Sequence, residues 1–137
     1  YIVNSIMGSI SSQFGFELSI EIILGYIFAP IAWLMGIPWS EAVISGELLG
    51  IKTTLNEFVA YPALAALENG ELSDRSKLIT FYSLCGFANL SSVGILISGI
   101  TAMAPERKDD LIKVSFKALV GATLASCMTG LIVGIFI

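Results

Sequence analysis

The sequence contains no histidine and few charged residues, and both absences narrow what the protein can be. Lys and Arg number 7, Asp and Glu number 11, the net charge is −4, and charged residues make up 13% of the chain. Soluble domains carry about a quarter charged residues. Without histidine, the commonest general base and metal ligand is missing. The small net charge provides no basic patch, so we expect no nucleic-acid partner.

Cysteine is also scarce. Cys85 and Cys127 lie far apart in apolar segments, without a CxxC pair or another metal-ligand spacing, and we interpret both as small core residues. The sequence has no Ser/His or Cys/His set, no HExxH and no phosphate-binding loop. We therefore predict that the protein is not an enzyme and that this chain holds no bound cofactor or metal.

Apolar residues dominate what is present. The chain of 137 residues is 55% hydrophobic, with a mean hydropathy of +0.87. Long apolar runs with so few charges indicate a lipid bilayer as the environment, and the expected fold class is an all-α membrane protein. The chain starts at Tyr1 without the basic region of a signal peptide. We interpret residues 1–17 as the end of a preceding helix and its loop, and expect an N-terminal part to be missing.

Two of the apolar blocks fit simple membrane crossings. Residues 18–35 are about long enough to span once, and Gly36 and Pro38 end this block. Residues 109–137 are predicted to form the last transmembrane helix. Its small residues favour close helix packing: Gly121, Ala122, Ala125, Ser126 and Gly130. Basic residues near Pro105 place that turn in the cytoplasm and the 68–74 loop outside.

The block 39–67 is different because Lys52 and Glu57 lie in its middle. A straight helix through lipid would put each charge near the bilayer centre, at a cost of about 2.5–3.5 kcal/mol apiece. Two short helices, 40–53 and 56–66, avoid this cost if they meet at a polar tip and return to the same side. Irregular backbone is tolerated where it faces protein or a water-filled cavity. The sequence therefore favours a re-entrant helical hairpin.

The block 76–104 is long enough to span but is interrupted at its centre. Small and hydrogen-bonding residues gather there: Gly86, Asn89, Ser91, Ser92 and Gly94. Such residues permit local unwinding, which frees backbone groups to face a cavity. The alternative is that these side chains only form hydrogen bonds between helices. We predict a broken transmembrane helix.

Polar side chains inside these blocks are candidate ligands of a solute. Glu57 is an intramembrane carboxylate and predicts a functional site, and the alternative is an internal pair with Lys52. Asn56 either binds solute or caps the second arm of the hairpin. Lys52 itself is expected to contact backbone carbonyls or carboxylates. Asn89 and Ser92 add donors and acceptors from the facing block.

The type of solute follows from this set of side chains. Phe87, next to Asn89, either packs in the core or flanks a planar ring. Carboxylate, amide and hydroxyl groups, without a nucleophile, suit a neutral polyhydroxyl ligand with a flat apolar part. Hydroxyl pairs on such a ligand can donate to the carboxylate of Glu57.

Two stretches resemble the concentrative nucleoside transporters. Residues 50–61, GIKTTLNEFVAY, are similar to the family's GxKxxxNEFVAY signature, and residues 85–95, CGFANLSSVGI, to its CGFANxSSIGI stretch. Residues 25–30 and the 103–107 turn also match, so the resemblance covers nearly the whole chain. It implies nucleoside:cation symport across the cell membrane by a homotrimer, driven by Na⁺ or, in some members, by H⁺.

The resemblance also implies roles for segments and residues. Residues 18–35 correspond to a scaffold helix near the trimer interface, 39–67 to the second re-entrant hairpin and 76–104 to the broken helix that faces it. The ribose contacts carried over are Glu57, Asn89 and Ser92, with Phe87 beside the nucleoside and Asn56 in the same motif. The family's base-recognising Gln-Thr-Glu stretch and most of its Na⁺ site are outside these 137 residues. The chain is thus predicted to supply the ribose-binding half of the site.

Two other functions compete with this one. A gate-type membrane domain for another solute, or one coupled to a GTPase, should lack the paired motifs that this chain has. A non-transporting membrane scaffold would leave Glu57 paired and dispensable.

Overall fold

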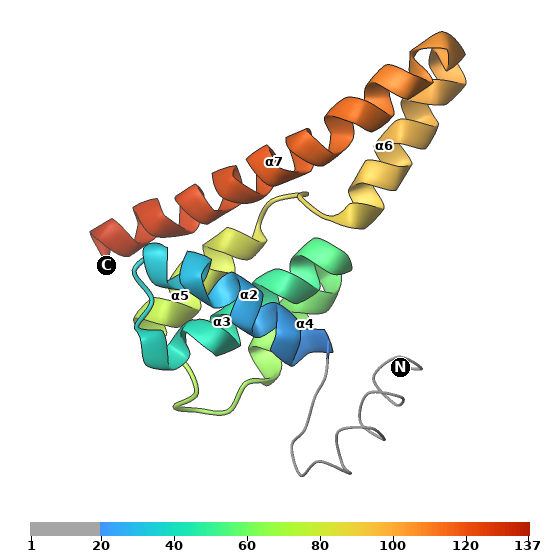
Figure 1. Ribbon diagram of the computed structural model, residues 1–137. Helices are drawn as coiled ribbons and strands as arrows, with labels where there is room; N and C mark the ends of the chain where they lie inside the picture. The colour runs from blue at the N-terminus through green and yellow to red at the C-terminus, as the bar shows by residue number, and fades with distance from the viewer. Residues whose placement is uncertain (1–19) are drawn as a thin grey trace.

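The structure, a computed structural model, describes residues 20–137, and this part of the chain is helical (Figure 1). The expectation for residues 1–17 lies outside the described residues. The elements are α2 (Ile20–Leu34), α3 (Trp39–Thr54), α4 (Glu57–Ala66), α5 (Asp74–Leu84), α6 (Leu90–Met103), the short 3₁₀ helix η2 (Pro105–Arg107) and α7 (Lys108–Phe136). The predicted all-α fold class is confirmed.

The lengths of the helices match a membrane protein with interrupted segments. The continuous helical stretch Pro105–Phe136 is long and apolar enough to cross a bilayer by itself, whereas α2 and α3 reach that length only together and are bent by 118°. The 15 residues of α2 extend about 22 Å at 1.5 Å per residue, less than the roughly 30 Å of hydrocarbon in a bilayer. The scaffold role of residues 18–35 stays a prediction.

Both predicted interruptions are breaks in the helical structure. The first falls at Leu55 and Asn56, between α3 and α4, and the second at residues 85–89, between α5 and α6. An extended connection leads from α5 to α6, and after η2 the chain reverses so that α7 runs back along α6 (Figure 1). The breaks support a hairpin over 39–67 and a broken helix over 76–104, and both assignments stay predictions.

Helix α3 is central in the fold because it packs against α2, α4 and α5. Small residues allow this close approach: a Cβ added at Gly46 would lie 2.9 Å from the backbone nitrogen of Ala29. The buried apolar residues at these contacts include Ala32, Ala42, Leu49, Ala60 and Ile79. This core holds the two helix breaks next to each other.

Helix α7 packs against α5 through small residues. Ser126, Gly130 and Gly134 are buried. The first two belong to the predicted small-residue face, whereas its members Ala122 and Ala125 are exposed. Gly121 differs, because no atom of residues 20–137 lies within 4 Å of a Cβ added there. Arg75 of α5 joins this packing, since its guanidinium donates to the carbonyl of Gly134 at 2.7 Å.

Candidate functional site

The carboxylate of Glu57 lies where the two breaks meet. Glu57 is the first residue of α4 and is 7% exposed. Its Oε2 accepts a hydrogen bond from Nδ2 of Asn89 at 3.2 Å. Its Oε1 is buried and has no hydrogen-bond partner among the described residues. A buried acceptor without a partner is costly in free energy, so Oε1 requires a donor that residues 20–137 do not supply.

No ion pair joins Glu57 to Lys52 within residues 20–137. Lys52 is 1% exposed, and its Nζ donates instead to the carbonyl of Ser83 at 3.1 Å. The expectation that Lys52 contacts a backbone carbonyl is confirmed. The internal pair offered as the alternative for Glu57 is absent from this structure.

Asn89 is held in place by the start of α6. Its Oδ1 accepts from the backbone nitrogen of Ser92 at 2.7 Å, and its own backbone nitrogen donates to Oγ of Ser92 at 3.4 Å. This reciprocal capping box fixes the first turn of a helix. Both ends of the Asn89 amide are therefore used, one by the cap and one by Glu57. The hydroxyl of Ser92 also lies 3.0 Å from the carbonyl of Phe87.

Asn56 and Phe87 flank this cluster. Asn56 caps α4, because its Oδ1 accepts from the backbone nitrogen of Val59 at 3.1 Å, which favours the capping alternative. The ring of Phe87 is 76% exposed. It borders a cavity of about 290 Å³ between α6 and α7 that Ser92 and Leu96 also line. An exposed aromatic ring beside a cavity can stack on a flat ligand.

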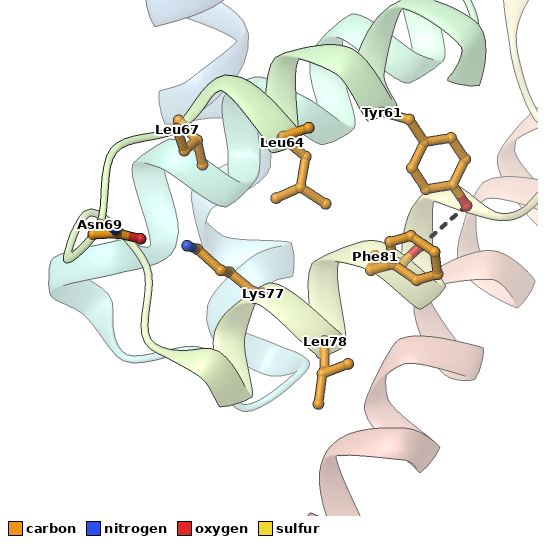
Figure 2. A pocket seen from close by; sticks show the side chains of 8 residues that line it. Tyr61, Leu64, Leu67, Asn69, Lys77, Leu78 and Phe81 are labelled. Carbon is orange, nitrogen blue, oxygen red and sulfur yellow. Dashed lines mark hydrogen bonds between the residues drawn. The ribbon is translucent and has the colours of Figure 1, made fainter.

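A larger groove, of about 600 Å³, lies elsewhere between α4 and α5 (Figure 2). Leu64, Leu78 and Phe81 line it, and the amine of Lys77 extends into it. None of the five predicted site residues borders it. At one end the hydroxyl of Tyr61 donates to the carbonyl of Phe81 at 3.3 Å. No pattern in the sequence indicated this contact, although Tyr61 belongs to the 50–61 motif.

The structure thus brings the two sequence motifs together. Glu57 and Asn89 are in direct contact, Ser92 and Phe87 belong to the same cap, and Asn56 immediately precedes Glu57. No group of three or more His, Cys, Asp or Glu side chains that can hold a metal occurs within residues 20–137. The cluster offers acceptors and donors for a neutral ligand.

Alanine at the two capping asparagines should separate their roles. We expect Asn56→Ala to lower the free energy of unfolding by about 1 kcal/mol, the usual cost of a lost N-cap. Asn89→Ala should cost about 2–4 kcal/mol, because it also leaves buried Oε2 of Glu57 without its donor. Denaturant unfolding of both variants in detergent checks this order. Equal losses would contradict the Asn89–Glu57 contact.

Short apolar helices that break at polar positions around a buried carboxylate are the architecture of secondary transporters. The chain belongs to the Na⁺ dependent nucleoside transporter family, because the family model described as "Na+ dependent nucleoside transporter C-terminus" matches residues 1–134. The predicted resemblance is confirmed. This is a family of transporters and not of enzymes.

Individual relatives agree with this membership. The chain is 44% identical to nucleoside permease NupC of Helicobacter pylori over 125 residues, which are 88% of this chain and 30% of the relative. It is 41% identical to solute carrier family 28 member 3 of Mus musculus over 148 aligned positions, covering 97% of this chain and 21% of the relative. An uncharacterized transporter of Bacillus subtilis, YutK, is 42% identical over 99% of this chain and 34% of its own length.

Solved structures give the same result for the fold. A structure of CNTnw in an inward-facing substrate-bound state matches with a TM-score of 0.90 and 41% identity, over 98% of this chain and 34% of that one. The chain therefore spans about a third or less of the length of these relatives.

Proposed function

We propose that this chain acts in nucleoside:cation symport across the cell membrane and supplies the ribose-binding half of the substrate site. The observation that carries the proposal is the carboxylate of Glu57, which is buried, fixed by Asn89 through Oε2, and left with Oε1 free of a partner among the described residues. A sugar carries neighbouring hydroxyls that can donate to such a carboxylate. Hydrogen bonds to a charged acceptor stabilise a complex by about 1.5–3 kcal/mol each.

The other residues of the cluster have distinct roles in this proposal. Asn89 orients the carboxylate through one hydrogen of Nδ2. The second hydrogen of Nδ2 and the hydroxyl oxygen of Ser92 are the groups that meet the sugar. The exposed ring of Phe87 lies beside the base. Asn56 holds the first turn of α4, and hence Glu57, in place through its cap. The relative named nucleoside permease NupC and the family description support a nucleoside as the solute.

The coupling ion belongs to the rest of the transporter. The family description names Na⁺, and H⁺ is the alternative for coupling. The resemblance to the family places most of the Na⁺ site outside these 137 residues, and the carbonyl of Ser83 at the end of α5 already accepts from Lys52. We therefore propose that Na⁺ binds outside the described part of the chain. We also propose a homotrimer as the assembly.

A non-transporting scaffold is the second candidate. It requires Glu57 to be paired within the protein. Among residues 20–137, Oε1 has no partner and no ion pair with Lys52 forms, and both observations count against a scaffold. A gate-type domain for another solute is disfavoured by the presence of both motifs in one chain.

Uptake measurements test the proposal at its simplest level. The full-length transporter is a protein of full family length that contains this chain. We expect it to accumulate uridine in proteoliposomes under an inward Na⁺ gradient. The 137-residue chain alone should not accumulate uridine, because the family's base-recognising Gln-Thr-Glu stretch lies outside it. Liposomes with choline in place of Na⁺ are the control. Robust uptake by the chain alone would contradict the half-site, and no uptake by the full-length transporter would contradict the function.

A further inference from the structure

Lys52 is a fully buried cation that the proposed substrate contacts do not use. It lies in the last turn of α3, three residues before the break that precedes α4, and is 1% exposed. A buried ammonium is costly unless it is compensated. Within residues 20–137 the acceptor found for it is the carbonyl of Ser83, at 3.1 Å from Nζ. Among the described residues its hydrogen bond therefore goes to the end of a helix, and no carboxylate lies within ion-pair distance.

The end of α5 is the element that Lys52 contacts. Carbonyls in the last turn of a helix have no partner within the helix and carry partial negative charge. Here each of three is satisfied: Phe81 accepts from the hydroxyl of Tyr61, Tyr82 from the backbone nitrogen of Cys85, and Ser83 from Lys52. Helices α3 and α4 thus each provide one side chain that donates a hydrogen bond to the last turn of α5. Figure 2 shows the hydrogen bond from Tyr61.

The segment that follows this end carries the site. Residues 85–89 connect α5 to α6 and include Phe87 and Asn89. Gly86 lies immediately beside the ammonium, since a Cβ added there would be 3.7 Å from Nζ of Lys52, and it would overlap the hydroxyl of Ser126 on α7. At Gly86 the 85–89 segment is therefore confined between α3 and α7.

We propose that Lys52 is a positioning residue whose ammonium serves as a built-in cation at the carbonyl end of α5 and thereby fixes the 85–89 segment for substrate binding. In secondary transporters the carbonyl ends of half-helices are places that bind coupling cations. In this chain the side chain of Lys52 occupies such an end. Lys52 acts through Ser83 and the segment, and does not touch the nucleoside. This inference rests on the proposed function for its link to the substrate.

The charge and the hydrogen bond of Lys52 can be separated by substitution in the full-length transporter. Lys52→Gln keeps a donor but removes the charge, whereas Lys52→Arg keeps the charge. Leu49→Ala is the matched control, because Leu49 is on the same helix, is 1% exposed and belongs to the apolar core. Uridine affinity is measured by calorimetry below each variant's unfolding temperature, and amide hydrogen exchange is followed at residues 85–89.

We expect Lys52→Gln to raise the Kd for uridine about tenfold or more and to speed exchange at 85–89, with Lys52→Arg closer to the wild type. Leu49→Ala should lower the unfolding temperature through its cavity yet leave Kd within about twofold. An unchanged Kd and exchange rate in Lys52→Gln would overturn the proposal, as would equal changes in Leu49→Ala. If the wild type binds no uridine, the proposed function fails, while exchange at 85–89 still decides the role of Lys52.

Discussion

Glu57→Gln in the full-length transporter is expected to raise the KM for uridine about 10- to 100-fold. This factor corresponds to the free energy of one or more hydrogen bonds to a charged acceptor. Asn89 donates to Oε2, so the amide oxygen of the glutamine would face Asn89. The amide nitrogen would then replace Oε1, the atom without a partner among the described residues. A donor would stand where the ribose hydroxyls require an acceptor. Initial rates of [³H]uridine uptake measure the effect.

A matched control separates this effect from a general loss of charge. Glu68 is exposed in the loop between α4 and α5, and Glu68→Gln should leave the KM for uridine unchanged. The amount of each variant in the membrane is compared by quantitative blotting before rates are interpreted. Unchanged uptake by Glu57→Gln would favour the scaffold alternative and contradict the ribose-binding role.

Alanine at two glycines of α7 is expected to change stability in opposite directions. A Cβ at Gly130 would overlap the hydroxyl of Ser83 on α5, so Gly130→Ala should destabilise the full-length transporter by about 1–3 kcal/mol through overpacking. A Cβ at Gly121 meets no atom of the described residues within 4 Å. Gly121→Ala should therefore stabilise the transporter by up to about 1 kcal/mol, the helix propensity of alanine over glycine.

Thermal unfolding in detergent, with both variants prepared in parallel, measures this contrast. Because Gly121 and Gly130 are on one helix and undergo the same substitution, a difference between them reports packing and not propensity. A loss of stability of the same size at both positions would contradict the close contact between α5 and α7 at Gly130.

Local chemistry explains why much of the fold was predictable from the sequence. Low charge and high hydropathy specify membrane helices, and the breaks at Asn56 and Asn89 are encoded by side chains that cap a helix three residues ahead. These interactions form between residues that are only a few positions apart in the chain. The capping box of Asn89 and Ser92 is an interaction of the same local kind, although the sequence predicted only a helix break there.

The tertiary structure decided which of these residues meet. Glu57 and Asn89 are 32 positions apart, and Lys52 and Ser83 are 31 apart. No periodicity in the sequence specifies either contact, because each depends on how α3, α4 and α5 pack. The sequence left the partner of Glu57 open between solute and Lys52, and packing directed Lys52 to the end of α5 instead.

The small residues of α7 also separate what the sequence determines from what the tertiary structure determines. By itself the sequence determined that α7 is an apolar helix with a face of small residues, because composition and length are properties of the chain alone. It did not distinguish Gly121 from Gly130. Only the approach of α5 buries Gly130 against Ser83 and leaves Gly121 open, because a contact between helices depends on the position of both.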